Sequence, residues 1–364
     1  MAKKSYIGVD GKARQVKKWY VGVDGKARKV KKGYIGVGGV ARPFIGGGEV
    51  SYYGTIEALS ASKGSASAPV GDYALFAGGY KSSGVDAYNT SLVRSTVTSL
   101  SKARGNLAGA PVGDYALFAG GYDYDPVTTV DAYNKSLTRS TPNNLWRARY
   151  NLASCSANGY ALFAGGFSVS TSVSNSISVY DASLTRKDPS LSVGRYNLAG
   201  ASVGEYALFA GGWTDNSFSA SRVVDAYNKS LTRSTPSAKV SIAAHLAGAS
   251  VGEYALFAGG CYDSSKTSIS QVDAYDTSLT RTTPTSLSKA RWALLGASLG
   301  DYAIFAGGMQ GNYPNTTTMY TVDIYNTSLV RSTPSVSINA SSATSLNNYA
   351  IFASTSKTYV YALV

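Results

Sequence analysis

The chain has 364 residues, a formal net charge of +13, 28 tyrosines, two cysteines and one histidine. The cysteines, Cys155 and Cys261, lie far apart and do not indicate a disulfide framework. One histidine with two separated cysteines also excludes the usual zinc spacings. No apolar stretch is long enough to cross a bilayer, and the opening "MAKKSYIGVD" lacks the apolar core of a secretory signal.

Residues 6–45 repeat with a period of 14: "YIGVDGKARQVKKW", "YVGVDGKARKVKKG" and "YIGVGGVARPFI". Each unit places Asp-Gly or Gly-Gly between two short β-like runs, which indicates a tight hairpin turn. We therefore predict an N-terminal extension of short β-hairpins over residues 1–46. A glycine-rich linker follows at 47–50.

The basic charge is concentrated in this extension. Residues 1–50 hold 12 Lys and Arg against 3 acidic residues, a balance of +9 that leaves +4 for the rest of the chain. Three interpretations are open: a solvated basic tail, docking onto an acidic protein surface, or nucleic-acid binding through the interleaved aromatic residues. We favour docking, because repeated hairpins are more than a charged arm needs, and nucleic acid is the least favoured partner. The predicted anchor residues are Lys17, Lys18, Trp19, Tyr20, Lys31 and Lys32.

A second repeat fills the rest of the chain. "YALFAGG" at 73–79 returns at intervals of 42 to 48 residues, a period typical of propellers or solenoids. One period reads as four short strands separated by turn signals, with nothing of helical length between them. Four strands without a helix predict a β-propeller blade, whereas β-solenoid coils are usually shorter, about 20–30 residues. The copies begin at Tyr73, Tyr115, Tyr160, Tyr206, Tyr254, Tyr302 and Tyr349.

The predicted fold is thus all-β: a seven-bladed propeller over residues 51–364. Its second strand, "ALFA", is apolar at every position, as expected for a strand covered on both faces. Its first strand uses Ala, Gly and Ser because it lies nearest the axis. After Tyr349 the last repeat lacks a fourth strand, so we expect "SYYGTIEAL" (51–59) to pair with 358–363 and close the ring.

The repeats resemble the kelch family. They share its glycine pair at the end of the second strand (Gly78-Gly79 in the first copy), a tyrosine in the third strand (Tyr88) and an arginine before the first strand (Arg104). The fourth strand reads "SLTRST" where kelch blades usually carry tryptophan. The extension, in turn, is similar to "YxGVDGxARxVKK" segments found in tandem in virion-associated phage proteins.

Little in the chain points to catalysis. His245 stands where other repeats carry small or polar residues, so we interpret it as structural. Most carboxylates recur in every repeat and are assigned to the scaffold; the exceptions include Asp123, Asp125, Asp215 and Asp263, and calcium binding at "YDYD" is a weak alternative. The recurrent Asn-x-Ser, as at Asn89, matches a glycosylation acceptor but is better explained as an Asx-type turn. No cofactor and no metal are predicted.

The loops between the second and third strands are irregular and open with an aromatic residue or Met. They share a face with the fourth-to-first loops, and a constant scaffold with one irregular rim is typical of binding loops. Ordinary loop composition is an equal alternative. The strongest candidate is Trp213, which we expect to be exposed. The other predicted ligand-binding residues are Tyr122, Tyr124, Phe167, Tyr262, Tyr313, Arg149, Arg195 and Arg291.

These patterns favour a non-enzymatic phage structural protein, located in the virion after assembly in the bacterial cytoplasm. Residues 1–46 would dock to other virion proteins, in multiple copies per particle. The propeller would bind a host cell-surface glycan or protein, without membrane insertion. Two alternatives remain open: a carbohydrate-active kelch-like enzyme, and a purely architectural capsid or tail decoration.

Overall fold

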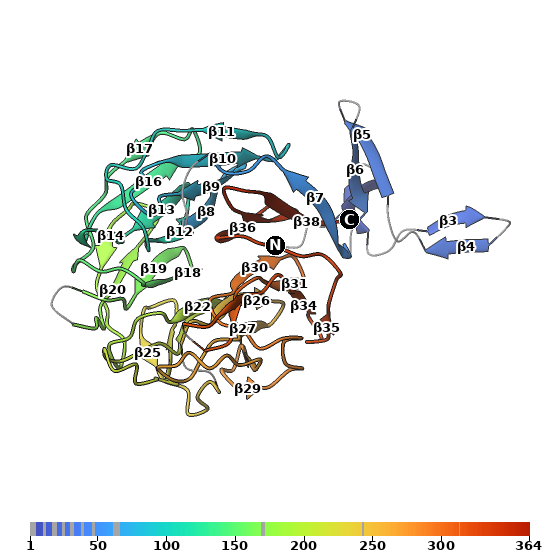
Figure 1. The fold of residues 1–364 in the computed structure, drawn as a ribbon. Coiled ribbons are helices and arrows are strands. Elements are labelled where there is room, and N and C mark those ends of the chain that lie inside the picture. The colour runs from blue at the N-terminus through green and yellow to red at the C-terminus, as the bar shows by residue number, and fades with distance from the viewer. Residues whose placement is uncertain are drawn as a thin grey trace.

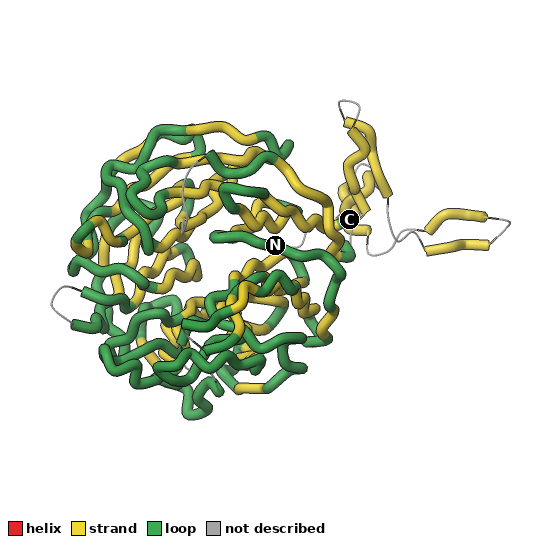
Figure 2. Tube along the Cα trace, in the orientation of Figure 1, coloured by secondary structure: helices red, strands yellow, loops and turns green. Residues whose placement is uncertain are grey.

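The computed structural model of the chain describes residues 5–9, 12–16, 20–23, 26–29, 33–37, 40–45, 48–60, 66–168, 172–241, 244–312 and 314–364. From residue 50 onward the strands form seven four-stranded antiparallel sheets, arranged radially around a centre (Figure 1). The described residues are all in strands, turns and loops (Figure 2). The chain is a seven-bladed β-propeller, as predicted.

The strands take four positions in each blade. The innermost are β8 (Ala66–Val70), β12 (Ala108–Val112), β18 (Ala153–Ala157), β22 (Ala199–Val203), β26 (Ala247–Val251), β30 (Leu295–Leu299) and β36 (Ser342–Leu346). The second are β9 (Tyr73–Ala77), β13 (Tyr115–Ala119), β19 (Tyr160–Ala164), β23 (Tyr206–Ala210), β27 (Tyr254–Ala258), β31 (Tyr302–Ala306) and β37 (Tyr349–Ala353). The third are β10 (Val85–Asn89), β16 (Val130–Asn134), β20 (Ile177–Tyr180), β24 (Val224–Tyr227), β28 (Val272–Asp276), β34 (Val322–Asn326) and β38 (Thr358–Leu363).

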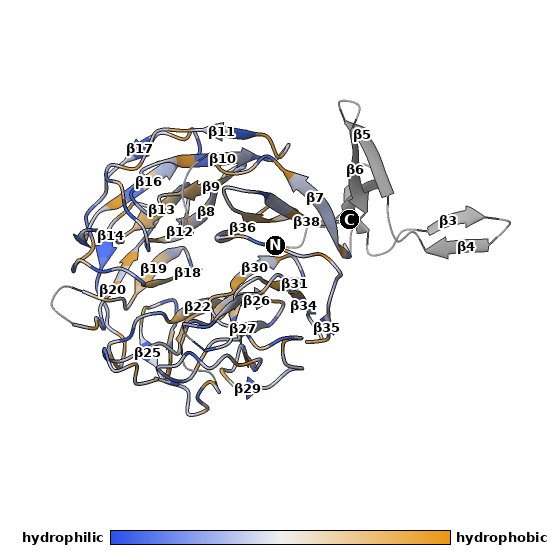
Figure 3. Ribbon diagram, viewed as in Figure 1, coloured by the Kyte–Doolittle hydropathy of each residue, from blue (hydrophilic) through white to orange (hydrophobic). Residues whose placement is uncertain are grey.

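The fourth, outermost strands are short in six blades: β11 (Arg94–Thr96), β17 (Arg139–Ser140), β21 (Arg186–Lys187), β25 (Arg233–Ser234), β29 (Arg281–Thr282) and β35 (Arg331–Ser332). The hydrophilic colour of β11 and β17 in Figure 3 marks this outer edge. Two further hairpins lie in second-to-third loops: β14 (Tyr122–Asp123) with β15 (Asp125–Pro126), and β32 (Met309–Gln310) with β33 (Thr317–Thr318).

The inner strands contact one another around the whole ring, β8 to β12 and onward until β36 meets β8. This close approach explains their small residues. A Cβ added to Gly200 would lie 2.3 Å from the carbonyl oxygen of Ser154 in the neighbouring blade. Serine hydroxyls also link neighbouring inner strands: Ser154 Oγ of the third blade donates to the Gly109 carbonyl of the second at 2.7 Å. Small residues at the axis are therefore required by geometry, as predicted.

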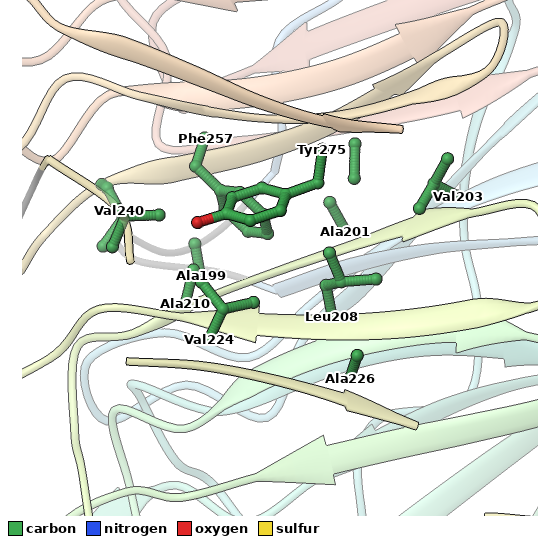
Figure 4. Close-up of a cluster of buried hydrophobic side chains, with 12 residues drawn as sticks. Ala199, Ala201, Val203, Leu208, Ala210, Val224, Ala226, Val240, Phe257 and Tyr275 are labelled. Carbon is green, nitrogen blue, oxygen red and sulfur yellow. The ribbon is translucent and has the colours of Figure 1, made fainter. Parts of the chain in front are cut away.

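Each blade completes the core of its neighbour. In the cluster of Figure 4, Leu208 and Val224 of the fourth blade pack with Phe257 and Tyr275 of the fifth. The buried tyrosine of the third strand also reaches the preceding loop in six blades; Tyr275 Oη donates to the Ala238 carbonyl at 2.7 Å. The equivalent phenylalanine packs edge-on against it, with 6.2 Å between ring centroids.

The glycine pair that ends the second strand of six blades has a conformational cause. Gly120 has φ +65°, and a Cβ there would lie 2.6 Å from the Arg149 carbonyl oxygen. The next residue, Gly121, donates its N–H to that same carbonyl at 2.9 Å. Only glycine allows this positive φ and this close approach together.

The two ends of the ring pair as predicted, with slightly different limits. Strand β7 (Val50–Ile56) forms the fourth strand of the last blade against β38, from Thr358↔Ile56 to Leu363↔Val50. Tyr52 packs edge-on against Tyr361 at 5.6 Å, so apolar packing adds to the backbone pairing. The strand includes Val50, which the sequence placed in the linker.

The extension contains three two-stranded antiparallel hairpins. They are β1 (Ser5–Val9) with β2 (Lys12–Val16), β3 (Tyr20–Val23) with β4 (Lys26–Lys29), and β5 (Gly33–Val37) with β6 (Val40–Ile45). Of the predicted anchor residues, Lys17, Lys18, Trp19, Lys31 and Lys32 lie outside the described residues. Tyr20 begins β3.

Deleting residues 50–56 should destabilise the ring strongly, because β38 would lose its outer partner and become an exposed edge. We expect a loss of about 3–5 kcal/mol, or a fall in Tm of roughly 10 °C. The control is deletion of residues 1–46, which should leave Tm unchanged. Equal melting temperatures for the two deletions would contradict the closure of the ring by β7.

Candidate binding site at the channel mouth

The two faces of the ring are built differently. On one face, the second-to-third loop of each of five blades pairs with the fourth-to-first loop through an isolated bridge, as in Tyr150↔Phe167 and Tyr196↔Trp213. On the other face, the turns are uniform. Asn134 Oδ1 accepts the N–H groups of Ser136 and Thr138, at 3.0 and 2.9 Å, which confirms the predicted Asx turn. We call the first of these the loop face.

The predicted arginine ligands are not on the surface, and that part of the prediction is wrong. Arg149, Arg195 and Arg291 have no exposed surface. Arg195 pairs with the buried carboxylate of Asp225, and Arg291 Nη2 lies 2.8 Å from Asp323 Oδ2. Their guanidinium groups also donate to strand carbonyls, such as Phe305 O at 3.3 Å from Arg291 Nη2. These arginines hold the loop to its own blade.

Burial also affects the charge on these groups. Desolvation lowers the pKa of Arg149 to about 10. In this blade the third strand has Ser178 where others have an aspartate that would pair with the arginine. Arg149 therefore stays charged at neutral pH, but its Nε and Nη1 have no hydrogen-bond partner among the described residues.

Trp213 is also buried rather than exposed, which corrects the strongest sequence prediction. It has no exposed surface and packs with Tyr196, Ala244 and Cys261. Its backbone bridges to Tyr196, and its indole packs across to Ala244 and Cys261 of the fifth blade. Trp213 is thus part of a small core under the loops.

Other predicted aromatic residues are accessible. Tyr122, Tyr124 and Tyr262 are 42%, 75% and 48% exposed, and Phe167 is partly buried; Tyr313 lies outside the described residues. The sequence reasoning missed Tyr80, which is 76% exposed. The ammonium of Lys81 lies 5.2 Å from the Tyr80 ring centre and 5.4 Å from that of Tyr124.

Four aromatic rings form a continuous belt on the loop face. Tyr122 lies 5.1 Å from Tyr150, Tyr150 lies 5.7 Å from Phe167, and Phe167 lies 5.2 Å from Tyr196, all between ring centroids. We call these four residues the aromatic belt. Tyr122 is 42% exposed and Tyr150 and Phe167 are half-buried, whereas Tyr196 is buried beside Trp213, so the belt offers a ligand mainly its first three rings.

Inside the loop face lies a cavity of about 260 Å³, which we call the channel mouth. In five successive blades, the residue two positions before the inner strand lines the cavity. In four of these blades the leucine that follows it lines the cavity as well. The lining residues are Asn106, Asn151, Asn197, His245 and Ala293 with Leu107, Leu152, Leu198 and Leu246. The polar groups of the mouth are thus neutral, and its apolar groups are aliphatic.

The mouth is held by its own backbone. The N–H of Asn151 donates to the Asn106 carbonyl at 3.1 Å, and the series continues through Asn197 and His245 to Ala293 at 2.9 to 3.0 Å. All five residues have φ between +52° and +55°, a conformation that asparagine adopts more readily than most residues. The recurrence of Asn before the inner strand was the available signal for this site.

His245 is the one titratable group of the mouth. Its ring lies 5.4 Å from Trp292 and 6.4 Å from Trp213, and its Nε2 is 3.2 Å from Asn197 Nδ2. Burial, with a smaller contribution from the nearby Lys266, lowers the pKa of the imidazole to about 4. His245 is therefore neutral at pH 7, when one ring nitrogen donates and the other accepts a hydrogen bond.

The remaining candidate groups are held in structure. Asp215 Oδ1 accepts two N–H groups of its own loop. Asp263 Oδ1 accepts the N–H of Thr267. Burial raises the pKa of Cys155 and of Cys261 to about 12, so both thiols are protonated at neutral pH. Over the described ranges, no three His, Cys, Asp or Glu side chains lie together as metal ligands would, and no helix there could span a membrane.

Comparison with known proteins defines the fold only. No protein-family model matches the chain, and no curated protein matches it either. Solved structures do match: one is the structure of YjhT, at 12% identity and a TM-score of 0.60, covering 76% of this chain and 98% of that one. At this identity the likeness shows the fold alone.

Replacing Trp213 with alanine should destabilise the protein by about 3–5 kcal/mol, because it removes a fully buried indole and leaves a cavity. The matched control is Tyr124→Ala, at an exposed ring, with an expected change within about 0.5 kcal/mol. Chemical denaturation of the full chain measures both. Similar free energies of unfolding for Trp213→Ala and wild type would show that the indole is not part of a core.

His245 should make the protein acid-sensitive. The unfolded imidazole takes up a proton near pH 6.5, whereas the folded one resists until about pH 4. The unfolded state thus binds more protons in this window, so stability falls with pH, by up to about 3 kcal/mol at pH 4. His245→Asn, which installs the residue of three other blades, should remove this part of the pH dependence. An unchanged pH profile would contradict the neutral, buried state of His245.

Proposed function

We propose that this chain is a non-enzymatic phage structural protein whose kelch-like propeller binds a host surface glycan at the channel mouth. The observation that carries the proposal is the contrast between the two faces. One face holds uniform turns, whereas the other gathers irregular loops and an aromatic belt around a cavity lined with neutral polar groups.

The kelch-like assignment rests on groups whose roles are physical. The glycine pair, the buried third-strand tyrosine and the arginine before the inner strand each have a contact that fixes them, as seen for Gly120, Tyr275 and Arg291. These are the residues on which the resemblance to kelch repeats depends.

A glycan is the ligand that suits the mouth best. Each carboxamide offers two N–H donors and an acceptor oxygen, which matches vicinal hydroxyl groups. The Nε2 of neutral His245 accepts from Asn197 Nδ2, so His245 adds a donor at Nδ1. The four leucines of the lining can contact the C–H face of a sugar ring. The described lining of the cavity includes no carboxylate, the group that glycoside hydrolysis commonly requires in pairs, and this favours binding over hydrolysis.

The extension supplies the other half of the proposal. Residues 1–50 carry +9 of the net charge of +13, which suits an acidic surface on another virion protein. Together with the similarity of its repeats to those of virion-associated phage proteins, this supports an anchor at residues 1–46. The propeller is then displayed outside the particle, in many copies.

The test is binding of the full chain to host cells and to their purified surface polysaccharide. The double substitution Asn151→Ala and Asn197→Ala should weaken binding by about tenfold or more, since it removes two hydrogen-bonding groups. Alanine fits this backbone, because Ala293 already occupies the equivalent position at φ +53°. Lys135→Ala, at an exposed side chain on the opposite face, is the control and should bind normally. Equal binding by the double variant, or none by wild type, would refute the proposal.

A further inference from the structure

The third blade departs from five of the other six at three positions that lie together. In those five blades a serine follows the buried residue of the fourth-to-first loop, an aspartate is second in the third strand, and a threonine lies two residues after the arginine that begins the fourth strand. The third blade has Trp146, Ser178 and Asp188 there instead. Three coordinated changes in one contact cluster need one common explanation.

In the other blades, these positions form a buried carboxylate site. Asp131 has no exposed surface; Arg104 Nη1 lies 2.8 Å from its Oδ2, and the Ser101 N–H donates to its Oδ1 at 3.1 Å. The same serine N–H contact recurs at the other four aspartates. The serines are Ser60, Ser101, Ser192, Ser241 and Ser288.

In the third blade, the carboxylate has moved outward. Ser178 Oγ donates to Asp188 Oδ1 at 3.0 Å and lies 3.3 Å from Arg149 Nη2, so a hydroxyl now stands between arginine and carboxylate. Arg186 Nε donates to the other oxygen of Asp188 at 2.9 Å. The Asp188 side chain is 26% exposed, against 0% for Asp131. The fourth strand also carries Lys187 where those five blades have serine or threonine, and the carboxylate now reaches solvent.

At the position of the loop serine, the third blade has an exposed tryptophan. Trp146 is 63% exposed, while Trp213 and Trp292 are 0% and 5% exposed. The guanidinium carbon of Arg186 lies 5.9 Å from its ring centre. Asn143, Asn144 and Arg147 around it are also exposed and polar. Such surroundings lack the apolar patch that a tryptophan usually shares at a protein interface.

We propose that Trp146, Arg186 and Asp188 form a second carbohydrate site, on the rim of the third blade, for one neutral sugar ring. The indole provides a flat surface for the C–H face of the sugar. Asp188 uses two of roughly four acceptor sites within the protein and can accept sugar hydroxyls with the others. Arg147 adds exposed donors. The proposal extends the glycan binding proposed above to a separate place, and it deepens that function by naming the ligand as uncharged.

The test is saturation-transfer NMR on the full chain with methyl glycosides of glucose, galactose, mannose and N-acetylglucosamine, and with glucuronate for comparison. At least one neutral glycoside should receive saturation from the wild type, and Trp146→Ser should lose at least about tenfold in affinity for it. This variant installs the serine of five other blades, so its melting temperature should be unchanged. Equal binding by wild type and Trp146→Ser, binding of glucuronate alone, or no binding at all would overturn the site.

A second variant tests the carboxylate without touching the indole. Ser178→Asp with Asp188→Thr rebuilds the buried carboxylate of the other blades and should lower the affinity for the same glycoside by about tenfold. Unchanged affinity would remove Asp188 from the site. The Asn151→Ala, Asn197→Ala variant should retain this rim binding, so failure of the rim site and failure of the channel mouth are distinguishable.

Discussion

No blade of this propeller can bury its own faces, and everything else in the ring follows from that constraint. A four-stranded sheet has two faces and no core between them. Leu208 of the fourth blade is buried only because Phe257 and Tyr275 of the fifth lie over it. The contacts must therefore continue around the ring until β7, from the beginning of the ring, pairs with β38 at its end.

The same packing decides where a ligand can bind. The inner strands approach so closely that a Cβ on Gly248 would lie 2.2 Å from the Gly200 carbonyl oxygen. Within these strands only small polar side chains such as Ser154 fit, so larger polar side chains can face the axis only at the strand ends. One residue per blade lies at this position, and in the second to fifth blades it is Asn106, Asn151, Asn197 and His245. The chemistry of the mouth thus depends on single residues that the fold itself hardly restricts.

The blades could be predicted from the sequence because the second strand recurs seven times at intervals of 42 to 48 residues, with the same strand pattern after six of the copies. What could not be read was the direction of individual side chains. Arg195 was assigned to the surface because charged residues usually are exposed, although it recurs with a third-strand aspartate and pairs with it out of solvent. Trp213 opens an irregular loop, but its indole packs across to Ala244 and Cys261 of the fifth blade. The one sign of Trp146 in the sequence is that it stands where five other blades have serine.

The proposed role depends most on the direction in which the ring is displayed. Electron cryo-microscopy of the virion to which we propose this protein belongs would measure that direction. Density for the hairpins against the particle, with Asn106, Asn151 and Asn197 facing solvent, is the expected result. A channel mouth turned toward the particle, with the Asx turns outermost, would contradict the proposal that this face meets the host surface.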